Sequence, residues 1–269
     1  MYTKGAGLGN YDIFEGYFKL LASAHKFLIT DKFLAIIDDK NVLNIKYHPI
    51  YSGNQFIHIL ENVKEITGDN SVVFMLDHKN NMFFLGDGDH VGKDFYREHV
   101  WTTFITNNVT KISLNEECII EKDQLLYFLT DNKLIDIDAK TCLFHPLNNL
   151  LYIDKKDKLY IINLGDNKEK LMASDIKQVY THNQKIYWID NDNILWVKNE
   201  SFPATALYRN VLKISCNENF ILILTINRDL YYVGNFLDIF TNVPSLISTN
   251  VYDVKCCSKQ SFAVIQKIL

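Results

Sequence analysis

The chain has 269 residues, of which 48% are hydrophobic and 22% are charged, as expected for a folded globular protein and not for a disordered one. Aromatic residues make up 13% of the chain, and side chains of this kind favour strands over helices. The formal net charge of −4 argues against a protein whose main ligand is nucleic-acid phosphate, although it leaves room for a local basic patch.

The five cysteines form no CxxC pair and are odd in number, which argues against a zinc site and against a disulfide framework. Residues 1–5 lack the apolar core of a signal peptide, and no apolar run reaches the ~18 residues that would span a bilayer. We therefore expect an intracellular protein, cytoplasmic or nuclear, that binds neither a membrane nor a cofactor.

One unit recurs along the chain: a short apolar run, a polar turn rich in Asp, Asn and Lys, and a second apolar run. Short apolar runs bounded by turn residues predict β-hairpins. The six copies lie at residues 27–36, 72–85, 119–128, 150–162, 186–197 and 220–233.

A second motif precedes most of the hairpins and consists of Asn or Asp, an apolar residue, two variable residues and another apolar residue. Its copies begin at Asn62, Asn108, Asp175, Asn210 and Asn250. Their spacings of 46, 67, 35 and 40 residues suit a propeller blade or a solenoid repeat. The longest spacing leaves room for one eroded copy near Cys142.

The last copy of the repeat breaks off after one strand, and its missing partner is predicted at the other end of the chain. We expect Met1 to Thr3 to pair beside Phe262 to Ile265, which would close a ring and remove exposed sheet edges. The prediction is one all-β domain over residues 1–269, a closed β-propeller with seven blades. Six or eight blades stay open as alternatives, because the copies near Phe18 and Cys142 are weak.

The repeats resemble those of the regulator of chromosome condensation family. Gly5-Ala6-Gly7-Leu8-Gly9 is similar to the glycine-rich strand end of that repeat, and residues 62–88 and 210–235 follow the repeat in order. Most copies lack the glycine before the hairpin and the histidine after it. The 27 asparagines indicate an AT-rich genome and favour a degenerate member from a giant virus or an intracellular parasite.

The resemblance implies a seven-bladed propeller whose last blade is shared between the termini. The best-known member of the family is an exchange factor for a small nuclear GTPase and binds the nucleosome, whereas other members are adaptors, ubiquitin-ligase modules or signalling scaffolds. No projecting wedge or acidic contact for exchange can be placed in this sequence, so the resemblance transfers no catalytic residue.

Motifs for catalysis and metal binding are missing from the sequence. It contains neither GxSxG nor HExxH, and residues 5–9 are not followed by the helix that a dinucleotide site requires. A calcium loop needs a bidentate acid near its end, and none is correctly spaced after Asp87, Asp89 and Asp94. The simpler interpretation is that these aspartates belong to turns of the repeat. We predict no catalytic, cofactor-binding or metal-binding residue.

The predicted function is a non-enzymatic scaffold that binds a protein partner, associated with chromatin or a viral genome only through that partner. The alternatives are guanine-nucleotide exchange on a small GTPase and an enzyme with its site in the propeller channel. Direct binding of nucleic acid is expected to be weak.

The candidate interaction residues are one tryptophan and four lysines. Residues 91–104 form the longest stretch that suits a helix or an inter-blade loop, and Trp101 lies within it. The lysines fall at similar repeat positions and could form a basic rim, or could simply be solvated side chains near turns. Trp188 and Trp196 lie inside repeat strands and are predicted to be core. The four lysines are Lys64, Lys111, Lys177 and Lys213.

Overall fold

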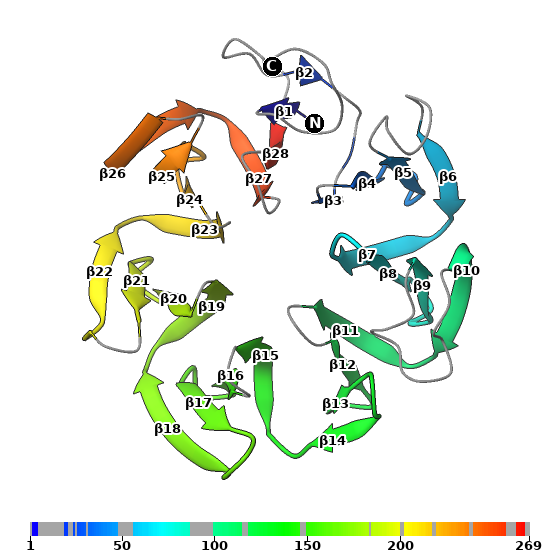
Figure 1. Ribbon diagram of the computed structural model, residues 1–269, viewed down its shortest axis with the longest axis horizontal. Coiled ribbons are helices and arrows are strands. Elements are labelled where there is room, and N and C mark those ends of the chain that lie inside the picture. The colour runs from blue at the N-terminus through cyan, green and yellow to red at the C-terminus, as the bar shows by residue number, and fades with distance from the viewer. Residues whose placement is uncertain are drawn as a thin grey trace. The chain divides into compact units, whose positions relative to one another are not determined.

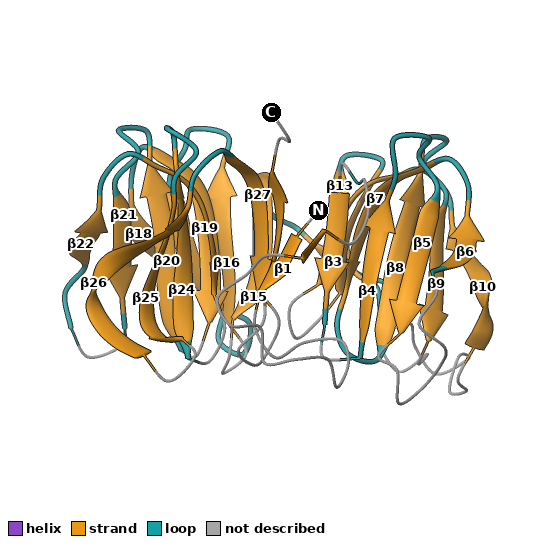
Figure 2. Cartoon of the chain, turned by 90° about the horizontal axis from the view of Figure 1, so that it is seen from above, coloured by secondary structure: helices purple, strands orange, loops and turns teal. Residues whose placement is uncertain are grey.

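The computed structural model describes residues 2–4, 19–20, 24, 26–30, 32–47, 56–86, 99–114, 118–145, 149–182, 184–199, 202–216, 219–236, 239–256 and 262–266. Every regular element in these ranges is a strand, and the strands are numbered β1 to β28 (Figures 1 and 2). The prediction of an all-β protein is therefore confirmed. In the same ranges no helix has the length and hydrophobicity to cross a bilayer.

The described strands form seven four-stranded sheets. Six sheets use four strands that follow one another in the sequence, and the remaining sheet combines two strands from each end of the chain. Contacts divide the chain into two compact units, residues 1–64 with 210–269 and residues 65–209, each with its own sheets.

The first unit contains three sheets, with strand orders β2-β1-β28-β27, β3-β4-β5-β6 and β23-β24-β25-β26. Their strands are β1 (Tyr2–Lys4), β2 (Lys19–Leu20), β3 (Lys26–Ile29), β4 (Phe33–Ile37), β5 (Leu43–Tyr47), β6 (Ile57–Leu60), β23 (Val211–Cys216), β24 (Phe220–Thr225), β25 (Leu230–Phe236), β26 (Ile239–Ser248), β27 (Val251–Cys256) and β28 (Phe262–Gln266).

The second unit contains four sheets, each made of four successive strands from β7 to β22, with β7 beginning at the boundary between the units. Their strands are β7 (Val63–Gly68), β8 (Val72–Asp77), β9 (Met82–Gly86), β10 (His99–Thr106), β11 (Val109–Leu114), β12 (Cys118–Lys122), β13 (Leu125–Phe128), β14 (Lys133–Ile135), β15 (Ala139–His145), β16 (Asn149–Asp154), β17 (Leu159–Asn163), β18 (Lys168–Ala173), β19 (Ile176–His182), β20 (Lys185–Asp190), β21 (Leu195–Lys198) and β22 (Thr205–Tyr208).

The two ends of the chain meet in one sheet of the first unit. Strand β1 pairs antiparallel with β28, with Tyr2 opposite Val264 and Lys4 opposite Phe262. Strand β2 pairs with the other edge of β1 (Figure 1). The N-terminal strand thus occupies an inner place in this sheet, where both of its edges are hydrogen-bonded. Met1 and residues 5–9, which the sequence analysis singled out, lie outside the described residues.

All six predicted hairpins are present as paired strands. Five of them join the second and third strands of a sheet, but the first, β3 with β4, joins the first and second strands. In that sheet the equivalent turn is the next one, Asp38–Val42, which connects β4 to β5. The eroded copy expected near Cys142 is also present, as β15 with its partner β16.

The hairpin turns are rich in Asp because an aspartate carboxylate organises the turn. In four sheets an Asp at the end of the second strand accepts a hydrogen bond from the backbone N–H four residues later, at 2.8–2.9 Å. This is the usual role of Asp in turns, where its short side chain satisfies nearby backbone donors. The four residues are Asp38, Asp77, Asp154 and Asp190.

Asn and Asp recur in the repeat because particular backbone positions are left-handed. The first residue of the second motif has a φ of 57–61° in all five copies. The third residue after each turn aspartate has a φ of 60–66° and is again Asn or Asp. Asn and Asp are the non-glycine residues that tolerate this region best.

The left-handed residues join neighbouring sheets through the backbone. The N–H of Val109, which starts β11, donates to the carbonyl of Asn80 in the preceding sheet at 3.0 Å, and the N–H of Ile176 donates to the carbonyl of Asp157 at 2.8 Å. The carbonyl of Asp175 accepts a bond from Asn191 of its own sheet at 2.7 Å. Asn80 and Asp157 therefore position the first strand of the next sheet.

A β-bulge explains why two variable residues separate the apolar positions of the second motif. In β11, β19, β23 and β27 the pairing register shifts between the first residue and the third. The extra residue lets positions three apart face the same side, although ordinary strands repeat every two residues. In these four strands both apolar positions are at most 6% exposed, whereas Ile66 of β7 is half-buried.

The hydrophobic cores lie between neighbouring sheets. One cluster joins β8 and β9 to β11 and β12 through Phe74, Phe84 and Ile120. Similar clusters join β16 and β17 to β19 and β20, and β24 and β25 to β27. At these three junctions one sheet therefore depends on the other for burial of its apolar face.

One expectation about local structure is wrong. Residues 91–104 were expected to be helical or an irregular loop, but residues 99–106 form strand β10, which pairs with β9 through two irregularities. The register shifts leave the apolar alternation of this strand incomplete, and the sequence pattern therefore resembled a loop. Residues 91–98 lie outside the described residues.

Deleting residues 1–9 should destabilise the protein, because β28 would lose its β1 partner and expose an unpaired edge. We expect a loss of about 2 kcal/mol or more, which corresponds to a fall in Tm of roughly 4–8 °C for a chain of this size. Thermal unfolding followed by circular dichroism measures the change. The control is a chain extended by a few residues at the N-terminus, and equal Tm values for the deletion and the full chain would contradict the prediction.

The left-handed Asn positions should tolerate Gly but not a β-branched residue. Asn108 is exposed and has a φ of 59°. Asn108→Val should lower the free energy of unfolding by roughly 1–2 kcal/mol, because a β-branched side chain clashes with the backbone in this conformation. Asn108→Gly is the matched control and should cost less than Asn108→Val in a urea titration. Equal losses for the two variants would overturn this account of the repeat.

Candidate functional site

The four candidate lysines occupy two positions of the repeat and not one. Lys64 and Lys177 directly follow the first apolar residue of the second motif, whereas Lys111 and Lys213 come one residue later, after the bulge. Because the bulge separates these two positions, their side chains do not form one equivalent series. The four lysines of the predicted basic rim therefore do not share one position of the repeat.

In the second unit, two of these lysines contact groups from nearby strands. The Nζ of Lys111 lies 3.1 Å from Oε2 of Glu121 on β12 and donates to the carbonyl of Lys140 at 3.2 Å. The Nζ of Lys177 donates to Oδ1 of Asn193 at 2.9 Å. Such contacts offset part of the positive charge that a phosphate group would meet.

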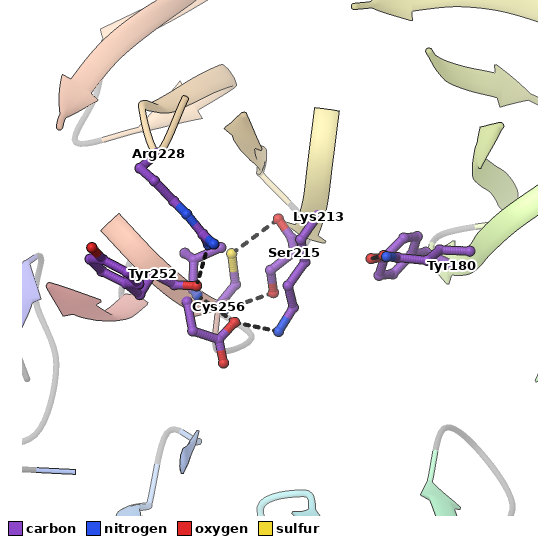
Figure 3. A network of polar contacts seen from close by, with 9 residues as sticks. Tyr180, Lys213, Ser215, Arg228, Tyr252 and Cys256 are labelled. Atoms are coloured by element: carbon purple, nitrogen blue, oxygen red, sulfur yellow. Dashed lines mark hydrogen bonds and ion pairs between the residues drawn. The ribbon is translucent and has the colours of Figure 1, made fainter. Parts of the chain in front are cut away.

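In the first unit, Lys213 forms an ion pair across a sheet junction. Its Nζ contacts Oδ1 of Asp253 on β27, and both side chains are about 30% exposed. Figure 3 shows this pair beside a second link, in which the N–H of Cys256 donates to Oγ of Ser215 at 3.0 Å. The Sγ of Cys256 also lies 3.4 Å from the carbonyl oxygen of Ser215. Two residue pairs of β27 and β23 are thus joined by three polar contacts.

Arg228 occupies a position that the four aspartate-started turns give to Asn or Asp. Its φ is 69°, and its carbonyl accepts the N–H of Val251 at 2.9 Å, as the repeat requires. Its guanidinium carbon lies 4.9 Å from the centre of the Tyr252 ring, and Nη1 donates to the Tyr252 carbonyl at 3.4 Å (Figure 3). A non-Asn residue held in this region is strained, and such strain gathers at functional sites.

The same turn departs from the repeat a second time. Thr225 stands where four other sheets have Asp, and its Oγ1 accepts the N–H of Asp229 at 3.2 Å. Tyr252, the residue beneath Arg228, is 45% exposed. Neither Arg228 nor Tyr252 belongs to the residues predicted from the sequence. The sequence signal for Arg228 is that it replaces the Asn or Asp of the four aspartate-started turns.

The remaining predicted residues do not join this group. Lys64 is half-buried on β7, and its carbonyl accepts a hydrogen bond from Nζ of Lys26 at 2.6 Å. Trp101 lies on β10, with its backbone in the strand and its side chain outside the described atoms. Trp188 is 4% exposed, which confirms the prediction that it is core, whereas Trp196 is half-buried and packs against the same cluster.

The described residues contain no constellation that suggests catalysis. No group of three or more His, Cys, Asp or Glu side chains is placed to hold a metal ion in those ranges. Burial raises the pKa of the Cys142 thiol to about 12, so this thiol stays protonated at neutral pH. Asp136 and Asp138 are exposed in the link between β14 and β15, where Asp138 pairs with Lys155 at 2.6 Å.

No protein-family model and no curated protein matches the sequence. Solved structures are nevertheless similar. Prp20p from Saccharomyces cerevisiae, described with its binding properties to Gsp1p and histones, has a TM-score of 0.78 at 11% identity, covering 98% of this chain and 90% of that chain.

Two further structures agree with this result. A chain in the complex of Kap60 with yeast RCC1 (Prp20) has a TM-score of 0.72 at 10% identity, covering 90% of this chain and 80% of that one. The β-propeller domain of Cps50 (Swd1) from Myceliophteria thermophila has a TM-score of 0.56 at 11% identity, covering 88% and 91%. At these identities the likeness shows the fold alone, and that fold is the β-propeller.

Proposed function

We propose that this protein is a non-enzymatic scaffold that presents a rigid propeller surface to a protein partner. We infer that the seven sheets serve as the blades of one closed propeller of the Prp20p kind. The observation that carries the proposal is the likeness to Prp20p over 98% of the chain, since the structure of that protein is described with its binding to histones and Gsp1p. Histones and Gsp1p are therefore the first partners to test.

We place the contact surface at the junction of the β23–β26 sheet with β27. Arg228 and Tyr252 are of the residue types that carry most binding energy at protein interfaces. The Arg228 guanidinium lies against the ring of Tyr252, so both side chains are ordered before a partner arrives. Preordering reduces the entropy lost on binding.

Substitution of Arg228 separates stability from binding. Arg228→Asn installs the residue that the equivalent turns use, so the free energy of unfolding should be unchanged or slightly higher. Binding of purified histones or Gsp1p, measured by biolayer interferometry, should weaken at least tenfold, or about 1.4 kcal/mol. Tyr252→Ala should weaken binding similarly.

Lys155→Ala provides a matched control, because it removes an exposed cation of the other unit. That variant should bind as the unmodified chain does. Undiminished binding by Arg228→Asn would place the contact surface elsewhere, and no binding of either partner at micromolar protein would contradict the partner assignment.

The isolated protein should bind duplex DNA only weakly. The candidate lysines occupy two repeat positions, and two of them pair with carboxylates. A titration of labelled duplex at ~150 mM salt should give no submicromolar binding, and any association with a genome should run through a protein partner. Submicromolar affinity with a steep salt dependence, lost on substitution of the four lysines by Ala, would show the opposite.

A further inference from the structure

A cavity of about 250 Å³ opens in the second unit, at the junction of the β15–β18 sheet with the β19–β22 sheet. Its walls are two indole rings, one carboxylate and three small residues. The volume is below the 300–1,000 Å³ of typical small-molecule sites, so it suits a single side chain and not a nucleotide. The lining residues are Ala173, Ser174, Trp188, Asp190, Trp196 and Ala204.

The two indoles are held in nearly parallel planes. Trp188 and Trp196 stand directly opposite each other on β20 and β21, with ring centres 6.4 Å apart and an interplanar angle of 11°. The ring N–H of Trp196 donates to Oδ2 of Asp190 at 2.8 Å, which sets the rotation of the indole. Oδ1 of Asp190 accepts the N–H of Ile194 at 2.8 Å.

The carboxylate gives this cavity a negative charge. No lysine or arginine forms an ion pair with Asp190 within the described ranges, and none lines the cavity. The π faces of tryptophan are also negative, and they attract cations more strongly than those of other aromatic residues. Both features of the wall therefore favour a cationic ligand and disfavour an anion.

The neighbouring sheet offers an internal comparison. Tyr152 and Tyr160 occupy the equivalent places on β16 and β17 and stack with ring centres 5.1 Å apart. There the phenol of Tyr152 donates to Oε1 of Glu169 at 2.6 Å. In the tyrosine pair the donor is therefore the ring of the second strand, Tyr152, and the acceptor lies on β18. In the tryptophan pair the donor is the ring of the third strand, Trp196, and the acceptor is Asp190, which lines the cavity.

We infer that this cavity binds the trimethylammonium end of a methylated lysine from a partner protein. The Asp190 carboxylate and the stacked indole pair beside it attract the charge, while Ala173 and Ala204 contact the methyl groups. An unmodified ammonium suits the cavity less well, because its three N–H groups need acceptors and the lining side chains offer only those of Asp190 and Ser174. The inference extends the proposed interaction function, since it names the chemistry of one contact.

The test is a fluorescence titration of the full chain carrying Trp101→Phe, which leaves only the two cavity tryptophans. The probes are Nε-trimethyl-lysine, unmodified lysine, choline and the neutral analogue of trimethyl-lysine in which carbon replaces the ammonium nitrogen. Saturable binding of trimethyl-lysine, at least tenfold tighter than that of lysine and of the neutral analogue and no weaker than that of choline, is the expected result. Equal binding of the neutral analogue or of lysine would overturn the inference, and tighter binding of choline would assign the cavity to a free small molecule.

Two substitutions check which groups are responsible. Asp190→Asn keeps the shape and an acceptor oxygen but removes the charge, and it should weaken trimethyl-lysine binding severalfold. Tyr160→Phe, on the equivalent pair of the neighbouring sheet, should leave the affinity unchanged. Unaltered affinity in Asp190→Asn, or no binding by the parent chain, would refute the inference. The histone and Gsp1p measurements do not use these probes, so a failure here is distinguishable from a failure of the proposed function.

Discussion

The backbone bond between a left-handed turn residue and the first N–H of the next sheet is the constraint on which the repeat depends. It occurs at four described junctions with N···O distances of 2.8–3.0 Å. The bond requires a positive φ at the acceptor residue, and it fixes where the following first strand begins. The bulge after that strand's first residue then turns two apolar side chains into the same intersheet core. The accepting residues are Asn41, Asn80, Asp157 and Arg228.

At Arg228 the backbone constraint is kept while the side chain makes a different contact. The fold needs only the carbonyl of this residue, so the side chain is free to vary at the cost of backbone strain. The chain uses that freedom to place a guanidinium over Tyr252, at a junction where Lys213 and Asp253 also pair. The tryptophan cavity arises in a comparable way, because the position filled by Tyr160 in one sheet holds Trp196 in the next.

Much of the fold could be predicted from the sequence. The six hairpins follow from short apolar runs and Asp-rich turns, whereas the left-handed conformation of the repeated Asn or Asp is a finding of the structure. The strand at residues 99–106 could not be predicted, because two register irregularities disturb its alternation. The basic rim stays a prediction: its four lysines fall at two positions of the repeat, and in Lys111 and Lys213 a bulge precedes the lysine.

The sequence by itself determined the strand content, the turn chemistry and the blade-sized period, because these depend on local propensity and on residues close in the chain. Only the tertiary structure decided which side chains meet across sheet junctions. Arg228 and Tyr252 are separated by 24 positions, and Lys213 and Asp253 by 40, yet each pair is in contact. Such contacts depend on how one sheet packs against the next, which is set by intersheet burial and backbone bonding and not by any local pattern.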